Sequence, residues 1–89
     1  MEDAINREFD KFERIVEKYY LKEKEDKALE CVEWARGYAT DFPQQRDIDE
    51  ATRLAKKIGK YISDQGKTYY EAARDRLVKK LLQIPLEIN

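Results

Sequence analysis

The sequence predicts an all-α fold, a small antiparallel bundle of three to four helices arranged as two αα-hairpins. Apolar residues recur at spacings of three and four along most of the chain, which is the period of an amphipathic helix. Only three Gly and two Pro interrupt these stripes. With 89 residues, 42% of them hydrophobic, the chain has room for one core, so we expect a single helical domain at residues 1–85 and a short tail at 86–89.

The first helix is expected at about residues 3–20, with Asp3 as its N-cap. Its apolar stripe consists of Ile5, Phe9, Phe12, Val16 and Tyr19. Six charged residues follow at positions 22–27 and interrupt the stripe, which favours a turn with Asp26 as the N-cap of the next helix. Because none of the six is a helix breaker, one continuous long helix is the alternative.

The second helix is expected at about residues 27–41, and Pro43 ends it. It carries two apolar stripes, one of Ala28, Val32, Ala35, Ala39 and Phe42, the other of Cys31, Trp34 and Tyr38. A helix that is apolar over two stripes either lies between two neighbours or carries an intermolecular face. Gly37, at a cost of about 1 kcal/mol relative to Ala, allows close approach of another helix.

The third helix is expected to begin at Asp47, which acts as N-cap and forms with Glu50 a pattern similar to a capping box. Gly66 is expected to end it in a left-handed conformation. Thr68 and Glu71 form a second capping-box pattern at the start of the fourth helix, which Pro85 ends. The stripes of the two helices are Ile48, Ala51, Ala55, Ile58 and Ile62, and Tyr70, Ala73, Leu77, Leu81 and Ile84.

In residues 12–43, large and small side chains occupy positions that suit a packed helix pair. The large ones are Phe12, Ile15, Tyr19 and Val32, and the small ones are Ala28 and Ala35. This pattern resembles one tetratricopeptide-type repeat, although Val16 stands where that family has Gly or Ala and Pro43 comes about three residues late. The resemblance implies a protein-interaction module, as does the likeness to microtubule-interacting-and-trafficking-type bundles. A generic αα-hairpin with small residues at the helix crossing is the alternative.

The charges divide the chain into an acidic and a basic part: residues 1–52 carry a net charge of −6 and residues 53–80 one of +6. Either the two parts neutralise each other, within a chain or between chains, or the basic part contacts phosphates. In the second case a small regulator binds nucleic acid through residues 67–84. Its candidate contacts are Lys67, Arg74, Arg76, Lys79 and Lys80.

Catalytic chemistry has few candidates. The chain has no His, which removes the commonest general base and metal ligand. The paired carboxylates Glu30 and Glu33 followed by Asp47 and Glu50 resemble the Mg²⁺ motifs of all-α nucleotide pyrophosphatases, but the second pair has the reverse order. Residues 66–68, Gly-Lys-Thr, match the end of a phosphate-binding loop, but the earlier Gly and the preceding strand that this loop requires are missing from the pattern. We therefore expect no enzyme, no cofactor and no metal site.

The sequence favours a small non-catalytic helical module that binds protein, as an adaptor or a homo-oligomer. Its candidate interface consists of Cys31, Trp34, Tyr38 and Phe42, although aromatic side chains such as Trp34 and Tyr38 would serve a core equally well. The nucleic-acid-binding regulator is the alternative, and a pyrophosphatase-like enzyme comes third. No apolar run is long enough for a membrane span, and the lone Cys31 cannot form an internal disulfide, so we expect a cytoplasmic protein with no membrane partner.

Overall fold

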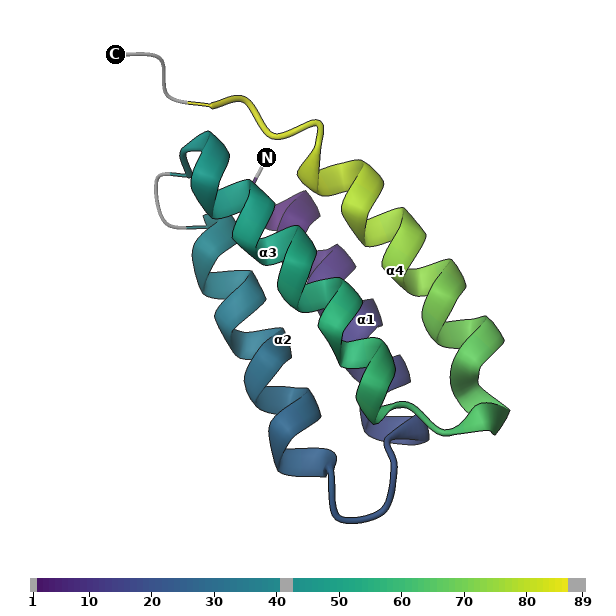
Figure 1. Cartoon of the computed structure of the whole chain (residues 1–89). Coiled ribbons are helices and arrows are strands. Elements are labelled where there is room, and N and C mark those ends of the chain that lie inside the picture. Colours follow the sequence, from purple (N-terminus) through teal and green to yellow (C-terminus); the bar gives the residue numbers. More distant parts are fainter. Residues whose placement is uncertain (1, 41–42, 87–89) are drawn as a thin grey trace.

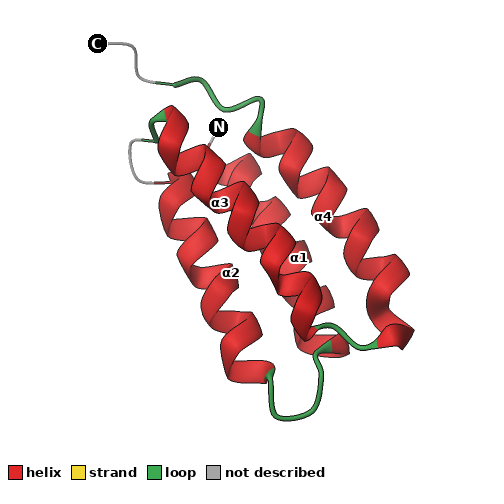
Figure 2. Cartoon of the chain, viewed as in Figure 1, coloured by secondary structure: helices red, strands yellow, loops and turns green. Residues whose placement is uncertain are grey.

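The computed structural model describes residues 2–40 and 43–86, which form four α-helices joined by turns (Figure 1). The helices are α1 (Glu2–Tyr19), α2 (Glu25–Thr40), α3 (Gln45–Lys57) and α4 (Lys67–Leu81), and two 3-10 turns, Ile58–Tyr61 and Asp64–Gly66, join α3 to α4. Figure 2 shows no strand in this part of the chain. The all-α prediction is confirmed. No helix among the described residues is both long and apolar enough to cross a membrane.

The four helices run up, down, up and down, and each packs against two antiparallel neighbours (Figure 1). α1 contacts α2 and α4, and α3 contacts the same two helices from the other side of the bundle. The bundle is a rod of 44 × 19 × 17 Å. The two predicted hairpins, α1–α2 and α3–α4, therefore close into a single four-helix bundle.

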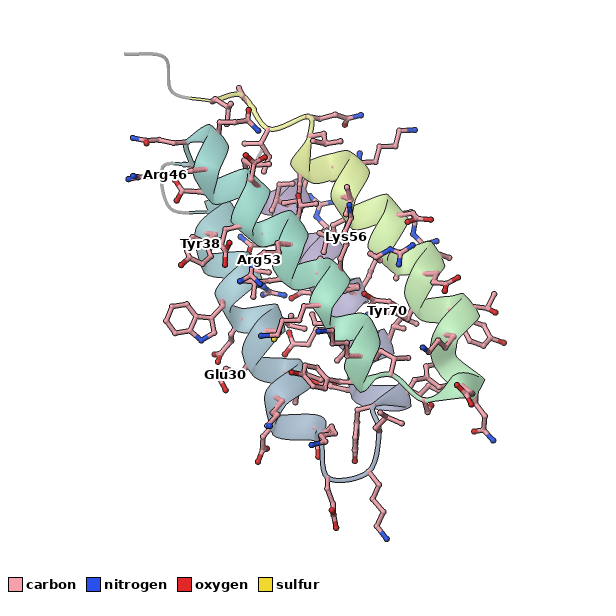
Figure 3. The ribbon with its side chains drawn as sticks, viewed as in Figure 1. Glu30, Tyr38, Arg46, Arg53, Lys56 and Tyr70 are labelled. Atoms are coloured by element: carbon pink, nitrogen blue, oxygen red, sulfur yellow. The ribbon has the colours of Figure 1, made fainter. Side chains whose placement is uncertain are left out.

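The core consists of the predicted apolar stripes. Phe9, Phe12 and Val16 of α1 have no exposed surface, and α2 and α3 contribute mainly alanines, which let these two helices approach closely. Tyr70 of α4 is also buried, and its hydroxyl donates a hydrogen bond to the carbonyl of Ala55 (Figure 3). Burial of each large side chain stabilises the fold by about 1.5–3 kcal/mol. The ends of two stripes, Tyr19 and Ile84, are only partly buried.

The turn between the first two helices is confirmed, and backbone hydrogen bonds hold it. Glu23 adopts a positive φ of 71° within it. The N–H of Leu21 donates to the carbonyl of Tyr61 at 2.6 Å, and the N–H of Ser63 donates to the carbonyl of Tyr19 at 2.7 Å. This pair of bonds, which we call the backbone clasp, joins the α1–α2 turn to the α3–α4 connection.

Four predicted helix caps are wrong. α1 begins at Glu2, so Asp3 lies inside the helix and not at its N-cap. α2 begins at Glu25, so Asp26 lies inside its first turn, where its negative charge interacts favourably with the positive end of the helix dipole. α3 begins at Gln45 with Gln44 as N-cap, and Asp47 instead accepts the N–H of Gln44 at 2.9 Å from the third helical position. Thr68 lies within α4, whose N-cap position is Gly66.

Gly66 is not a left-handed stop, because its φ is −97°. The reason for a glycine here is space. A Cβ atom at this position would lie 2.1 Å from the Cβ of Tyr19, closer than real side chains approach. Gly66 therefore lets the α3–α4 connection pass directly against the end of α1.

Candidate protein-interaction surface

The second apolar stripe of α2 lies on the outside of the bundle. Trp34 is 58% exposed, and Tyr38, one turn further along, is half-buried. Their ring centroids lie 6.4 Å apart with an interplanar angle of 35°. The core stripe of Ala28, Val32, Ala35 and Ala39 already fills the side of α2 that faces the other helices, so the indole projects from the rod.

Two depressions flank these aromatic rings. The first, which we call the Gly37 notch, has a volume of about 590 Å³ and is lined by Glu33, Trp34, Gly37, Tyr38 and Asp47. The space over Gly37 is open, because a Cβ atom there would meet no atom of the described residues within 4 Å. An aromatic side chain therefore stands directly beside a hollow on one face of the protein.

The second depression runs between α2 and α3 and has a volume of about 460 Å³; we call it the α2/α3 groove. Residues from the outer side of α2 form one wall, and residues of α3 form the other. Figure 3 shows Arg53 of α3 reaching toward α2 on the same side of the bundle as Tyr38 and Glu30. The residues of the groove used below are Lys27, Cys31, Trp34, Arg53, Leu54 and Lys57.

Charge is distributed unevenly along this surface. Lys27, near the start of α2, and Lys57, at the end of α3, lie in the groove toward the α1–α2 turn, together with Glu30, so the lysines outnumber the carboxylate there. Asp47 lies in the notch, toward the opposite end. Between them the carboxylate of Glu50 accepts hydrogen bonds from Arg53 and forms an ion pair with it, which lowers the pKa of Glu50 and raises the pKa of Arg53. The surface therefore has a basic end and an acidic end.

Cys31 lies in the groove as a half-buried free thiol. Burial raises its pKa, and this effect outweighs the opposing influence of the positive charges of Lys57 and Arg53. A reactive cysteine needs a lowered pKa. Cys31 therefore serves this surface as a small apolar side chain rather than as a nucleophile.

The structure brings three of the four predicted interface residues together, since Cys31, Trp34 and Tyr38 follow one another along the outer side of α2. Phe42 lies outside the described residues. Sequence reasoning missed the contribution of α3, namely Arg53, Leu54 and Lys57. The signal was that Lys57 follows Leu54 by three residues and Arg53 by four, a spacing that places all three on one side of a helix.

The predicted nucleic-acid contacts on α4 do not form one group. Arg74 pairs with Asp75 and lies over the ring of Tyr70. Lys67 is exposed at the first turn of α4, and the 100° step per residue of an α-helix places it on Arg74's side of the core stripe. The same step turns the exposed Arg76, Lys79 and Lys80 toward the other side.

In the described ranges, one ion pair joins the acidic and basic parts of the chain, that of Glu50 with Arg53, and it lies within α3. The ion pair that connects two helices is that of Arg36 with Asp10 and Glu13, between α2 and α1, both of the acidic part. The remaining ion pairs lie within single helices. Ion pairs between helices of the described chain therefore do not explain the opposite charges of the two parts.

The carboxylates that resemble a Mg²⁺ motif are divided between the two depressions, with Glu33 and Asp47 in the notch and Glu30 and Glu50 in the groove. Residues 2–40 and 43–86 hold no group of three side chains that could bind a metal ion. Gly66 lies in a 3-10 turn packed on Tyr19, and no strand precedes it, so residues 66–68 do not form a phosphate-binding loop.

Within residues 2–40 and 43–86, three further large apolar side chains are exposed, and they lie apart from Trp34. Tyr69 is 57% exposed but stacks on Tyr19, with ring centroids 5.2 Å apart and nearly parallel planes. Leu21 lies in the α1–α2 turn, and Leu82 follows the end of α4. Neither residue lines the notch or the groove. Trp34 thus differs from all three because it combines high exposure with adjoining hollows.

The chain matches no protein-family model, no curated protein and no solved structure.

Proposed function

We propose that this chain is a small, non-catalytic helical module that binds protein through the outer face of α2 and α3. The observation that carries the proposal is Trp34, a large aromatic residue that is 58% exposed between the notch and the groove. Tryptophan is among the residues that contribute most to binding when a partner covers them. The single cysteine allows no internal disulfide, so we place this module in the cytoplasm.

The surroundings of Trp34 support binding of a protein. A typical interface has an aromatic centre surrounded by polar residues. Here the centre consists of Trp34 and Tyr38 with the small side chain of Cys31, and the surrounding residues include Lys27, Lys57 and Asp47. Burial of the indole would supply affinity, and the basic and acidic ends would orient the partner.

Photo-crosslinking in the cells that express the chain tests this proposal. A photoreactive amino acid replaces exposed Glu33 at the notch in one version, and exposed Ala72 on α4 in a matched control. We expect discrete protein adducts from position 33, which disappear when Trp34→Ala is added and which position 72 does not form. The same adduct pattern from both positions, or no protein adduct from position 33, would refute the proposal.

Nucleic-acid binding through α4 is a second candidate function. It is favoured by Arg76, Lys79 and Lys80, which are exposed and for which the described part of the chain shows no ion-pair partner. Binding of this kind weakens steeply as salt rises. It therefore predicts salt-dependent retention on heparin that is reduced by Lys79→Gln with Lys80→Gln and unchanged by Lys56→Gln on α3. Equal elution of all three proteins would exclude α4 as the binding site.

A further inference from the structure

We infer that the partner of this face is a second copy of the chain. The two copies form a twofold-symmetric dimer in which their α2 helices pack antiparallel. The indole of Trp34 in each copy enters the Gly37 notch of the other. This inference rests on the proposed function and specifies its partner.

Gly37 is the first argument, because no contact with the residues that the structure describes requires it. The other two glycines have a reason for lacking a side chain. A Cβ at Gly66 would lie 2.1 Å from Tyr19, and a Cβ at Gly59 would lie 3.2 Å from the ring of Tyr70. At Gly37 there is open space, yet a glycine inside a helix costs about 1 kcal/mol relative to alanine. A neighbouring molecule that approaches the backbone of α2 would explain it.

The shape of the face is complementary to itself. Trp34 projects at one wall of the notch, and Gly37 lies at the notch three residues, or about 4.5 Å, further along the same helix. A twofold axis that passes between these two residues places Trp34 of each copy opposite Gly37 of the other. A projection and a hollow on one face are what an isologous interface needs, because both copies use the same surface.

The chemistry of the notch suits an indole. The indole would lie against the Cα of Gly37 and the ring of Tyr38, which offer apolar contacts. The indole N–H is a donor that needs an acceptor when it is buried. The carboxylates of Glu33 and Asp47 line the same notch and provide that acceptor.

Charge agrees with the antiparallel arrangement. Lys57 and Lys27 lie toward one end of the face and Asp47 toward the other. The twofold axis reverses the direction of the second copy, so the basic end of each copy comes to the side of its partner's acidic end. A parallel arrangement would instead bring the lysines of the two copies together, which is unfavourable.

The available area is sufficient for a dimer. A stable interface of standard size buries about 800 Å² on each partner. The bundle exposes 6112 Å² in all, so such an interface would use about an eighth of its surface. One long side of a rod of 44 × 19 × 17 Å offers an area of this order.

Light scattering after size exclusion, over a range of concentrations, tests the dimer with four proteins. They are the wild type, Trp34→Ala, Gly37→Leu, which fills the notch, and Ala72→Leu, a matched control that adds the same bulk on exposed α4. We expect the wild type and Ala72→Leu to dimerise. The other two should dissociate with a Kd raised roughly 30-fold or more, as for residues at the centre of an interface. Circular dichroism should show unchanged helix content for Gly37→Leu, since its side chain enters open space.

Mixing the two defective variants tests the twofold arrangement itself. In a mixed pair, one Trp34–Gly37 contact is intact. At the other contact, the side chain added by Gly37→Leu occupies the space that Trp34→Ala empties. Native mass spectrometry should therefore find a heterodimer in an equimolar mixture at concentrations where each variant alone is a monomer.

A wild type that is monomeric at all concentrations, a Gly37→Leu protein that dimerises as tightly as the wild type, or a mixture without heterodimer would overturn the inference. The photo-crosslinking result separates this failure from failure of the proposed function. Adducts from position 33 to a different protein would leave the interaction module in place with another partner. The absence of any protein adduct would remove both.

Discussion

The three glycines of the chain provide a test in which one type of substitution has opposite effects. Gly66→Ala should destabilise the fold, because the new Cβ would lie 2.1, 2.2 and 2.7 Å from the Cβ, Cγ and Cδ1 atoms of Tyr19. Gly37→Ala should stabilise it, because no atom of the described residues lies within 4 Å of the new methyl group. Both positions have backbone conformations that alanine adopts, since no glycine of the described chain has a positive φ. Space alone therefore distinguishes them.

The magnitudes follow from the surroundings of each position. Gly37→Ala gains helix propensity, worth up to about 1 kcal/mol. At Gly66 the overlap is with the stem of a side chain, not its flexible end, so Tyr19 and the 3-10 turn must move apart. Overpacking of this kind costs about 1–3 kcal/mol. In a domain of this size each kcal/mol shifts the melting temperature by about 4–8 °C, so the two variants should melt on opposite sides of the parent protein.

The measurement is urea denaturation followed by far-UV circular dichroism, with the free energy of unfolding compared at equal m-value. All variants carry Trp34→Ala, so that self-association does not contribute to the apparent stability. Gly59→Ala is the intermediate case, with its Cβ 3.2 Å from the ring of Tyr70. If Gly66→Ala were as stable as its parent, or Gly37→Ala less stable, the assignment of these glycines to tight and open space would be wrong.

Four further outcomes are expected. Leu77→Ala, at a position with no exposed surface, should lower the free energy of unfolding by about 2–5 kcal/mol in urea denaturation. Tyr70→Phe, which removes the buried hydrogen bond to the carbonyl of Ala55, should cost about 1 kcal/mol in the same assay at neutral pH. Burial raises the pKa of Tyr70 in the folded state. The stability that the protonated hydroxyl contributes is therefore complete below the pKa of the unfolded tyrosine and is lost as the pH rises through the folded pKa. A pH series should show that the free energy of unfolding falls less steeply at alkaline pH for Tyr70→Phe than for the wild type. Arg36→Gln removes a partly exposed ion pair with Asp10 and should cost less than about 1 kcal/mol, with the difference from wild type shrinking in high salt.

The sequence predicts the helices and the core well because both depend on periodicity. The residues of the four stripes are buried with few exceptions, because an amphipathic helix packs with its apolar stripe toward the core. The helix ends are predicted less well. Asp26, Asp47 and Thr68 have side chains that suit a cap, but each helix begins one or two residues before them, because the geometry of the preceding turn fixes its first residue. Cap preference amounts to about 1 kcal/mol and yields to tertiary packing.

The sequence predicts the candidate surface only in part, because the pattern within one helix does not report the position of its neighbours. The spacing of Cys31, Trp34 and Tyr38 places them on one side of α2, but the spacing alone does not say whether α3 covers that side. In the structure α3 packs beside the stripe and leaves Trp34 exposed. Gly66 shows the same limit, because its contact with Tyr19 joins residues 47 positions apart, and no local pattern reports such a contact.

The backbone clasp makes the two ends of the rod unequal in their resistance to local opening. At the clasped end, separation of α1 from α4 must break the bonds of Leu21 and Ser63 together with the stacking of Tyr19 on Tyr69. Local opening in native proteins begins where the fewest such contacts must break at once. Amide hydrogens at the clasp should therefore exchange with solvent late, and those at the α2–α3 end of the rod early. The Gly37 notch lies toward that second end, so a partner bound there would slow exchange at this end and reduce the difference between the two ends.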